Sequence, residues 1–191
     1  HRWDFPPDPR PLADIATRNT LRLLNLTNEL LDLEKVEAGQ FEVRKDQVDL
    51  REPIRHAVEA MQGLAQERNH RLLLTSPDLP MFVMGDATRL EQVGMNLLSN
   101  ALKHAKGPDP VAIRLEARPE GPWVGVSNAG NPIPPEFQDR IFQTFHQLEP
   151  QAGTSGLGLS LSKAIIEAHG GRIGFESGAE ATTFFFQLKG A

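Results

Sequence analysis

Cysteine is absent from the 191 residues of this sequence. Its absence excludes disulfides, thiolate metal sites and cysteine nucleophiles together, and it favours a cytoplasmic protein. Long apolar runs are also missing. No stretch approaches the roughly 18 residues that a membrane-spanning helix needs, so we expect no membrane contact within this chain. The first seven residues, HRWDFPP, are too polar and too rich in proline for a signal peptide.

The sequence also lacks an excess of positive charge. Its 20 Lys and Arg residues stand against 25 Asp and Glu residues, which gives a formal net charge of −5. Tight binding to a phosphate backbone requires a basic surface, so nucleic acid is not expected as a partner. With 39% hydrophobic and 24% charged residues, the composition is that of one globular domain with room for a helical appendage.

Four prolines between residues 6 and 11 forbid a regular helix at the start of the chain, so residues 1–11 are expected to be irregular. A long helix is predicted over residues 12–39, with its end at Ala38-Gly39. A heptad seam runs along it: Leu12, Ala16, Asn19, Leu23, Leu26, Leu30 and Leu33, widened by Leu24 and Leu31. A strip this broad must be buried, either by a second helix or by the rest of the same chain.

Residues 40–191 mix helical and strand-like patterns. Helical spacing predicts helices over residues 50–68, 86–105 and 156–169. Strands are predicted over residues 41–44, 71–75, 81–84, 111–117, 123–127, 172–176 and 182–188. A mixture of this kind indicates a sheet with helices packed on one face, which is an α+β sandwich.

The predicted helix that starts at Asp86 has an unusual polar side. Gln92, Asn96, Asn100 and Lys103 align along one stripe, opposite the apolar face. Two carboxamides one turn apart, followed by a cation, offer oxygen ligands to a hard metal ion and positive charge to a phosphate. A solvated helix face explains the same residues.

A glycine-rich turn, Gly153–Leu159, leads directly into the last predicted helix. Glycines let a backbone approach an anion, and the free N–H groups at a helix start bind it. The turn lacks the Gly-Lys-Ser/Thr of the phosphate loop and the complete dinucleotide fingerprint. The glycines are therefore suggestive only in combination with other features.

The predicted strand at residues 123–127 continues into the segment NAGNPIP, residues 128–134. Asn128 at its start has the groups to hydrogen-bond a planar base edge, and Gly130 leaves room for the ring. A plain turn after a strand would account for the same residues.

The order of these features resembles the ATP-binding domain of sensor histidine kinases. Residues 86–104 closely match the N box of that family, residues 128–134 its first glycine box, Phe142 and Phe145 its F box, and residues 156–159 its second glycine box. The stretch EAHGG at 167–171 resembles the sequence that follows. Residues 30–39 resemble the end of the second helix of the dimerisation domain, so the resemblance covers nearly everything from Leu12 onward.

This resemblance implies the Bergerat α/β sandwich, a mixed sheet with helices on one face, preceded here by a long dimerisation-type helix. It assigns residues 12–39 to an incomplete dimerisation and phosphotransfer domain and residues 40–191 to the catalytic domain. The implied cofactors are ATP and Mg²⁺. Asn100 is expected to coordinate Mg²⁺ with Asn96 beside it, and Lys103 and His104 to lie near phosphate and nucleotide. Adenine is expected at Asn128 and Gly130, the triphosphate at Gly156, Leu157 and Gly158 beneath a lid of residues 146–155, and Ile133, Phe145 and Leu159 around the pocket.

Some positions depart from the family pattern. Asn128 stands where the family usually has an Asp that accepts a hydrogen bond from the adenine amino group. An Asn oxygen still accepts, but the loss of charge assistance is worth on the order of 1 kcal/mol. Pro132 stands where a second glycine is usual, and Thr154 where the second glycine box often begins.

The phosphoacceptor segment of the family, His-Glu/Asp-x-x-x-Pro, has no match in this sequence. The resemblance thus implies a kinase domain that transfers the γ-phosphoryl of ATP to a histidine outside this chain, for relay to an aspartate of a response regulator. It also implies a homodimer through the N-terminal helix, within a cytoplasmic protein or the cytoplasmic part of a membrane-anchored sensor. Two alternatives remain: a degenerate kinase that serves as a nucleotide-binding or dimerisation scaffold, and an ATPase of the chaperone or topoisomerase branch.

Overall fold

The computed structural model describes residues 10–146 and 156–191. The chain divides into two compact units, residues 1–40 and 41–191, and each is described by itself. The expectation for residues 1–9 lies outside the described residues.

The described part of the first unit is one helix, α1 (Arg10–Glu37). It begins two residues before its predicted start, because Pro11 lies in the first turn, where a backbone N–H is not needed. Its end is marked by Gly39 with a φ of +67°. The N–H of Gly39 and that of the next residue donate to the carbonyls of Val36 and Lys35 at 3.0 and 2.8 Å, which is a Schellman motif. The predicted helix end is confirmed.

Large apolar side chains are exposed along α1: Leu12, Ile15, Leu21, Leu23, Leu24, Leu30 and Leu31. None of the helices in the described ranges has the length and apolarity needed to cross a bilayer. Of the predicted seam, Leu12, Leu23 and Leu30 and the widening residues Leu24 and Leu31 are thus exposed, whereas Leu33 is only 7% exposed.

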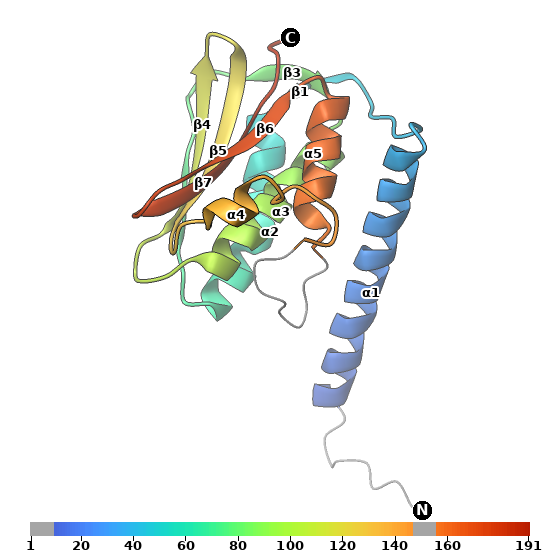
Figure 1. Cartoon of the computed structure of the whole chain (residues 1–191), viewed down its shortest axis with the longest axis vertical. Coiled ribbons are helices and arrows are strands. Elements are labelled where there is room, and N and C mark those ends of the chain that lie inside the picture. The colour runs from blue at the N-terminus through green and yellow to red at the C-terminus, as the bar shows by residue number, and fades with distance from the viewer. Residues whose placement is uncertain (1–9, 147–155) are drawn as a thin grey trace, which may run out of the picture. The chain divides into compact units, whose positions relative to one another are not determined.

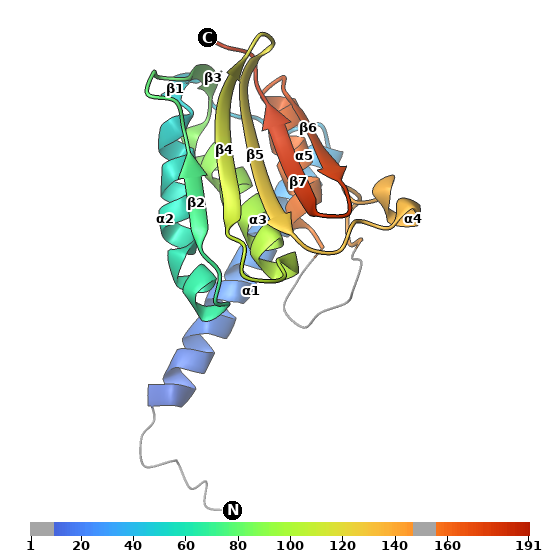
Figure 2. The same ribbon diagram turned by 90° about the vertical axis from the view of Figure 1, so that its left-hand side faces the viewer.

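The second unit contains two sheets (Figures 1 and 2). The five-stranded sheet has the order β2-β4-β5-β7-β6, with β2 parallel to β4 and all other neighbours antiparallel. A two-stranded sheet pairs β1 with β3. The strands are β1 (Asp46–Asp49), β2 (Leu72–Thr75), β3 (Phe82–Gly85), β4 (Val111–Arg118), β5 (Gly121–Ala129), β6 (Arg172–Ser177) and β7 (Ala181–Gln187).

Three helices cover one face of the larger sheet, with α3 between the other two (Figure 2). They are α2 (Arg51–Glu67), α3 (Ala87–His104) and α5 (Gly158–Ala168), and a short α4 (Pro135–Gln138) follows β5. The face of the sheet beneath them is apolar: Val111 and Ile113 of β4 and Phe186 of β7 have no measurable exposure. The predicted α+β sandwich, a mixed sheet with helices on one face, is confirmed.

Local sequence explains why α3 sits where it does. The Asp86 carboxylate caps its start by accepting the backbone N–H groups of Thr88 and Arg89. Gly94 lets α2 approach closely, because a Cβ at this position would lie 2.9 Å from the Cβ of Ala57. Packing against α2 thus buries the apolar side of α3 and leaves its polar side uncovered at the end of the sheet.

The predicted strand at residues 41–44 is wrong. The first rung of the small sheet joins Asp46 to Gly85, and β3 ends there because α3 begins two residues later. Residues before Asp46 consequently have no strand to pair with. Phe41 instead lies 5.3 Å from the guanidinium of Arg89, in a cation–π contact. The short helix α4 was not predicted either.

His169 ties the end of α5 to the start of α3. Its Nε2 accepts the Asp86 backbone N–H at 2.9 Å, and its Nδ1 lies 2.7 Å from the Ile165 carbonyl, to which it donates. Both bonds require the neutral ring with its hydrogen on Nδ1. Burial lowers the pKa of His169, with a smaller opposing effect from its bond to Ile165. A side chain at Gly85 would strike this ring, since a Cβ there would lie 2.7 Å from it.

We predict that folding stability falls as the pH falls below about 6.5, the ordinary pKa of histidine. Because the folded pKa of His169 is lowered, its stabilising effect is complete above that value and is lost as the pH drops through the folded pKa. Denaturant unfolding of the wild type and His169→Gln between pH 5 and 8 checks this. The variant should be less stable at pH 8 and less sensitive to pH, and two parallel pH curves would contradict the assignment.

Candidate functional site

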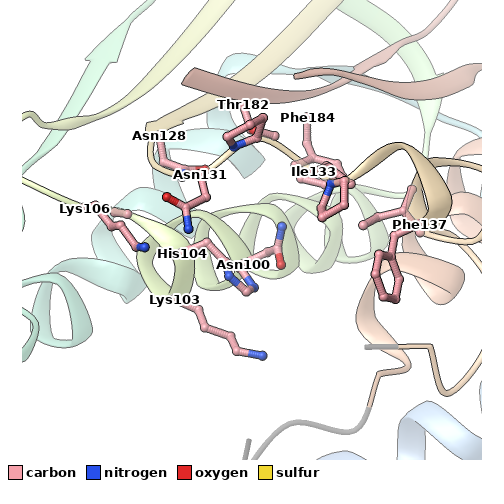
Figure 3. A pocket seen from close by; sticks show the side chains of 14 residues that line it. Asn100, Lys103, His104, Lys106, Asn128, Asn131, Ile133, Phe137, Thr182 and Phe184 are labelled. Atoms are coloured by element: carbon pink, nitrogen blue, oxygen red, sulfur yellow. The ribbon is translucent and has the colours of Figure 1, made fainter. Parts of the chain in front are cut away.

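A cavity of about 310 Å³ lies between the C-terminal part of α3, the end of β5 and β7 (Figure 3). It is lined by Asn100, Lys103, His104, Ala105, Lys106, Asn128, Asn131, Pro132, Ile133, Pro134, Phe137, Ile141, Thr182 and Phe184. Its size and its mixture of apolar walls with a few polar groups are typical of a small-molecule or cofactor pocket.

The α3 side of the cavity is polar and partly cationic. Asn100 and His104 lie one turn apart and face the cavity in Figure 3, and Lys103 also lines it. Lys106 follows the helix and is held in place by its backbone N–H, which donates to the Ala129 carbonyl at 2.8 Å. A carboxamide oxygen beside two ammonium groups suits a polyanionic ligand.

The floor of the cavity is formed by Asn128 of β5 and Thr182 of β7, which are directly opposite each other in the antiparallel pair. Their side chains are only 4% and 5% exposed. The Asn128 Nδ2 donates to the Ala129 carbonyl at 3.2 Å, so its Oδ1 is left to accept a hydrogen bond. A planar ligand that reaches this floor therefore meets an acceptor.

Gly130 allows a close approach between β5 and α3. A Cβ at this position would lie 2.6 Å from the His104 carbonyl oxygen. The sequence prediction gave Gly130 the role of making room for a base ring. In the structure, the atom nearest to a Cβ at Gly130 is instead a backbone oxygen of α3. Gly130 thus lets β5, with Asn128, lie close to the helix that carries Asn100.

The opposite wall is apolar, and its residues come after β5 in the sequence. Ile133 is 6% exposed and lines the cavity as predicted, together with Phe137 of α4 and Ile141. The Ile133 backbone N–H donates to the Ser177 hydroxyl at 2.8 Å. Phe184, which also lines the cavity, packs against Phe142 and Phe175 in an aromatic cluster.

The fold and this cavity have counterparts in known proteins. The family model for "Histidine kinase-, DNA gyrase B-, and HSP90-like ATPase" matches residues 85–191, which include every residue that lines the cavity. The chain belongs to this ATPase family.

Individual members of the ATPase family are similar to this chain in sequence and in fold. The alginate biosynthesis sensor protein KinB of Pseudomonas aeruginosa is 34% identical over 192 residues, which cover 98% of this chain and 32% of KinB. The catalytic domain of histidine kinase ThkA is 30% identical, with a TM-score of 0.68 over 76% of this chain and 95% of that domain. Histidine kinase AdeS of Acinetobacter baumannii shares the fold, with a TM-score of 0.78 and 22% identity over 97% of this chain and 86% of that one. The chain thus spans about a third of KinB.

The second glycine box of this ATPase domain lies beside α3. The Asn96 Nδ2 donates to the Gly158 carbonyl at 3.2 Å and to the Ser162 hydroxyl at 3.3 Å. Asn96 thereby joins α3 to the start of α5, and among the described residues it is not one that lines the cavity. Gly156, with a φ of +70°, precedes the helix, and Leu157 is buried.

Of the predicted lid, residues 146–155, only His146 lies within the described residues. Residues 147–155, with Thr154, lie outside the described residues. Phe145 precedes them with a φ of +61°, its side chain 67% exposed and its N–H donating to the Gly156 carbonyl at 3.1 Å. Phe145, Gly158 and Leu159 are not among the described residues that line the cavity. Their expected contacts with nucleotide remain predictions.

Sequence reasoning missed several residues of the cavity. Thr182 lines it only because β7 pairs with β5 in one register, which no local pattern specifies. Phe137 belongs to the short α4, whose sole sequence signal is Pro135 at its start. Lys106 comes two residues after the N box and Asn131 lies within the first glycine box, but neither position was predicted as a site residue.

Proposed function

We propose that residues 40–191 bind MgATP and form the catalytic part of a two-component sensor histidine kinase. The observation that carries the proposal is the cavity that Asn100 and His104 of α3, Asn128 of β5 and Thr182 of β7 line together. Membership of the ATPase family supports ATP as the ligand. The adenine would lie at the floor beside Asn128, and the phosphates toward Lys103 and the start of α5.

The residues present fit a Mg²⁺ ion that is held jointly by protein and nucleotide. The described residues contain no group of three or more His, Cys, Asp or Glu side chains that could hold a metal by themselves. Mg²⁺ usually keeps several waters and shares its ligands with substrate phosphates, so one oxygen from Asn100 suffices. When bound, the ion would neutralise charge on the phosphates.

The proposed reaction is transfer of the γ-phosphoryl group to a histidine outside this chain, followed by relay to an aspartate of a response regulator. Phosphoryl transfer depends mainly on positioning and charge stabilisation, so the domain needs no strong base of its own. The cations Lys103 and Lys106 would hold the polyphosphate, and the apolar wall around Ile133 would exclude water from the base.

Residues 12–39 are proposed to belong to a dimerisation and phosphotransfer domain, through which two copies associate. The support is the apolar surface of α1, along which Leu23 and Leu24 are 64% and 56% exposed. Burial of one leucine side chain contributes about 1.5–3 kcal/mol, so several such residues on one helix favour helix–helix association.

Asn128→Asp tests the nucleotide site where this sequence departs from its family. We expect ATP affinity to be kept or to rise by about 1 kcal/mol, roughly fivefold, because a carboxylate makes a charge-assisted bond to the adenine amino group. The free protein should melt at a lower temperature, since the buried carboxylate faces the Ala129 carbonyl without the amide donor. Titration calorimetry and thermal melting measure both effects.

The matched control is Asn131→Asp, which adds the same charge at an exposed position on the cavity rim. It should not reproduce the gain in affinity. If neither the wild type nor Asn128→Asp binds ATP, the proposed function fails, and the alternative of a degenerate kinase that acts as a scaffold takes its place.

A further inference from the structure

Arg68, which caps the end of α2, reaches the last turn of α3 with its side chain. Its Nη1 donates a hydrogen bond to the Leu102 carbonyl at 3.3 Å. Its own backbone N–H donates to the Leu64 carbonyl at 3.1 Å, so the residue is held at the end of α2. Arg68 is not among the described residues that line the cavity, and the proposed function gives it no role.

The Leu102 carbonyl is available to Arg68 because the chain leaves α3 early. In a regular α-helix this carbonyl would accept the backbone N–H of Lys106, four residues later. At Ala105, however, the backbone becomes extended, with φ of −60° and ψ of 138°. The Lys106 N–H consequently donates to the Ala129 carbonyl of β5 at 2.8 Å. The guanidinium of Arg68 thus supplies the partner that the helix itself no longer provides.

The position of the Lys106 side chain depends on this early exit. Lys106 lines the cavity together with Asn100 and Lys103. Each residue of an α-helix turns by about 100°, so a helix that continued to Lys106 would place it about 120° around the axis from Asn100. It would then face away from the cavity. The Lys106 N–H and the Arg68 guanidinium are therefore competing donors for one carbonyl.

We propose that Arg68 is a positioning residue that occupies the Leu102 carbonyl, keeps α3 from extending and so holds Lys106 at the cavity. This inference rests on the proposed function, in which Lys106 helps to hold the polyphosphate of ATP. The charge of a guanidinium also suits this place, because a cation stabilises the partial negative charge at a helix C-terminus. Arg68 thus acts on nucleotide binding from outside the cavity, through the backbone of α3.

The experiment is a double-mutant cycle of Arg68→Ala and Lys106→Met, with ATP affinity measured by titration calorimetry in Mg²⁺. Each single variant should bind ATP more weakly by roughly three- to tenfold, which is the worth of one polar interaction. The double variant should lose little more than either single variant, because Lys106 no longer lies at the cavity once Arg68 is removed. Arg68→Lys keeps a donor and the charge, so it should bind ATP nearly as the wild type does.

A second measurement needs no nucleotide. Backbone carbon chemical shifts in NMR distinguish extended from helical residues, so they report directly on Ala105, which is extended in this structure. In Arg68→Ala these shifts should move toward helical values, whereas in Arg68→Lys they should stay. A residue that contributed to packing alone would change folding stability and leave the conformation of Ala105 as it is.

Arg71→Ala is the matched control. Arg71 is exposed and lies three residues farther along the chain, and no hydrogen bond or ion pair of its side chain is found among the described residues. The substitution removes the same charge near the same end of α2. It should leave both the ATP affinity and the chemical shifts of Ala105 unchanged.

The outcomes separate this inference from the proposed function. No ATP binding by the wild type defeats the proposed function, and the chemical shifts of Ala105 then still test whether Arg68 holds the end of α3. Full ATP affinity or an unchanged Ala105 in Arg68→Ala overturns the role of Arg68. Independent losses in the double variant, or an equal loss in Arg71→Ala, overturn it as well, because charge alone would then explain the result. Normal ATP binding by Lys106→Met does so even if Arg68→Ala does not fold.

Discussion

Asn100→Ala should remove most of the Mg²⁺-dependent part of ATP binding. The loss expected for an uncompensated contact to a charged partner is about 1–3 kcal/mol, or roughly 5- to 150-fold in affinity. The physical reason is that Asn100 is the carboxamide of α3 that lines the cavity, and the described residues offer no other cluster of metal ligands. Titration calorimetry with ATP in Mg²⁺ and in a chelator measures the Mg²⁺-dependent component directly.

Gln92→Ala provides the control for this experiment. Gln92 belongs to the same polar stripe of α3, but its Oε1 accepts from the Arg89 guanidinium at 2.9 Å and it does not line the cavity. It should bind MgATP as the wild type does. If Asn100→Ala keeps the full difference between Mg²⁺ and chelator, Asn100 is not the metal ligand.

Gly130→Ala should both destabilise the domain and weaken nucleotide binding. The added Cβ would lie 2.6 Å from the His104 carbonyl oxygen, so β5 and α3 must move apart. Overpacking of this kind costs about 1–3 kcal/mol of folding stability. The same movement increases the separation between Asn128 and Asn100, and ATP affinity should fall with stability. Denaturant unfolding and calorimetry on one preparation measure the two effects together.

Gly63→Ala is a control for which we expect the opposite change in folding stability. Gly63 lies inside α2, and nothing lies within 4 Å of the Cβ that alanine would add. Alanine is the better helix former by about 0.5–1 kcal/mol, so this variant should gain stability and bind ATP normally. If Gly130→Ala is as stable as the wild type, the close approach of β5 to α3 is not a constraint.

The fold could be predicted from the sequence wherever one helix or strand carries its own signal. The Asp86 cap and the apolar period located α3 to within one residue at each end, and Gly39 located the end of α1. The prediction failed at residues 41–44, where the alternation is real but no strand is available for pairing. Strand formation depends on a partner that local sequence does not reveal.

Like the fold, the site could be predicted only where a local pattern in the sequence determines the position of a residue. Helical periodicity placed Asn96 and Asn100 on one stripe, yet each step of four residues turns the helix by about 40° beyond a full circle. That rotation directs Asn96 toward Gly158 of α5 and Asn100 toward the cavity. Thr182 depends on the register of β7 against β5, which forms between distant parts of the chain.

The order of strands in the larger sheet bears on how the domain is made in the cell. β7 is the last strand in the sequence, yet it lies between β5 and β6 and supplies both Thr182 and Phe184 to the cavity. During synthesis the chain emerges from its N-terminus, so the sheet stays open along β5 until almost all of the domain has left the ribosome. A nascent chain that has reached only α5 would expose the edge of β5 and could not hold a nucleotide. ATP would therefore act as a ligand of the finished domain only, and it would stabilise that state by mass action against partly folded ones.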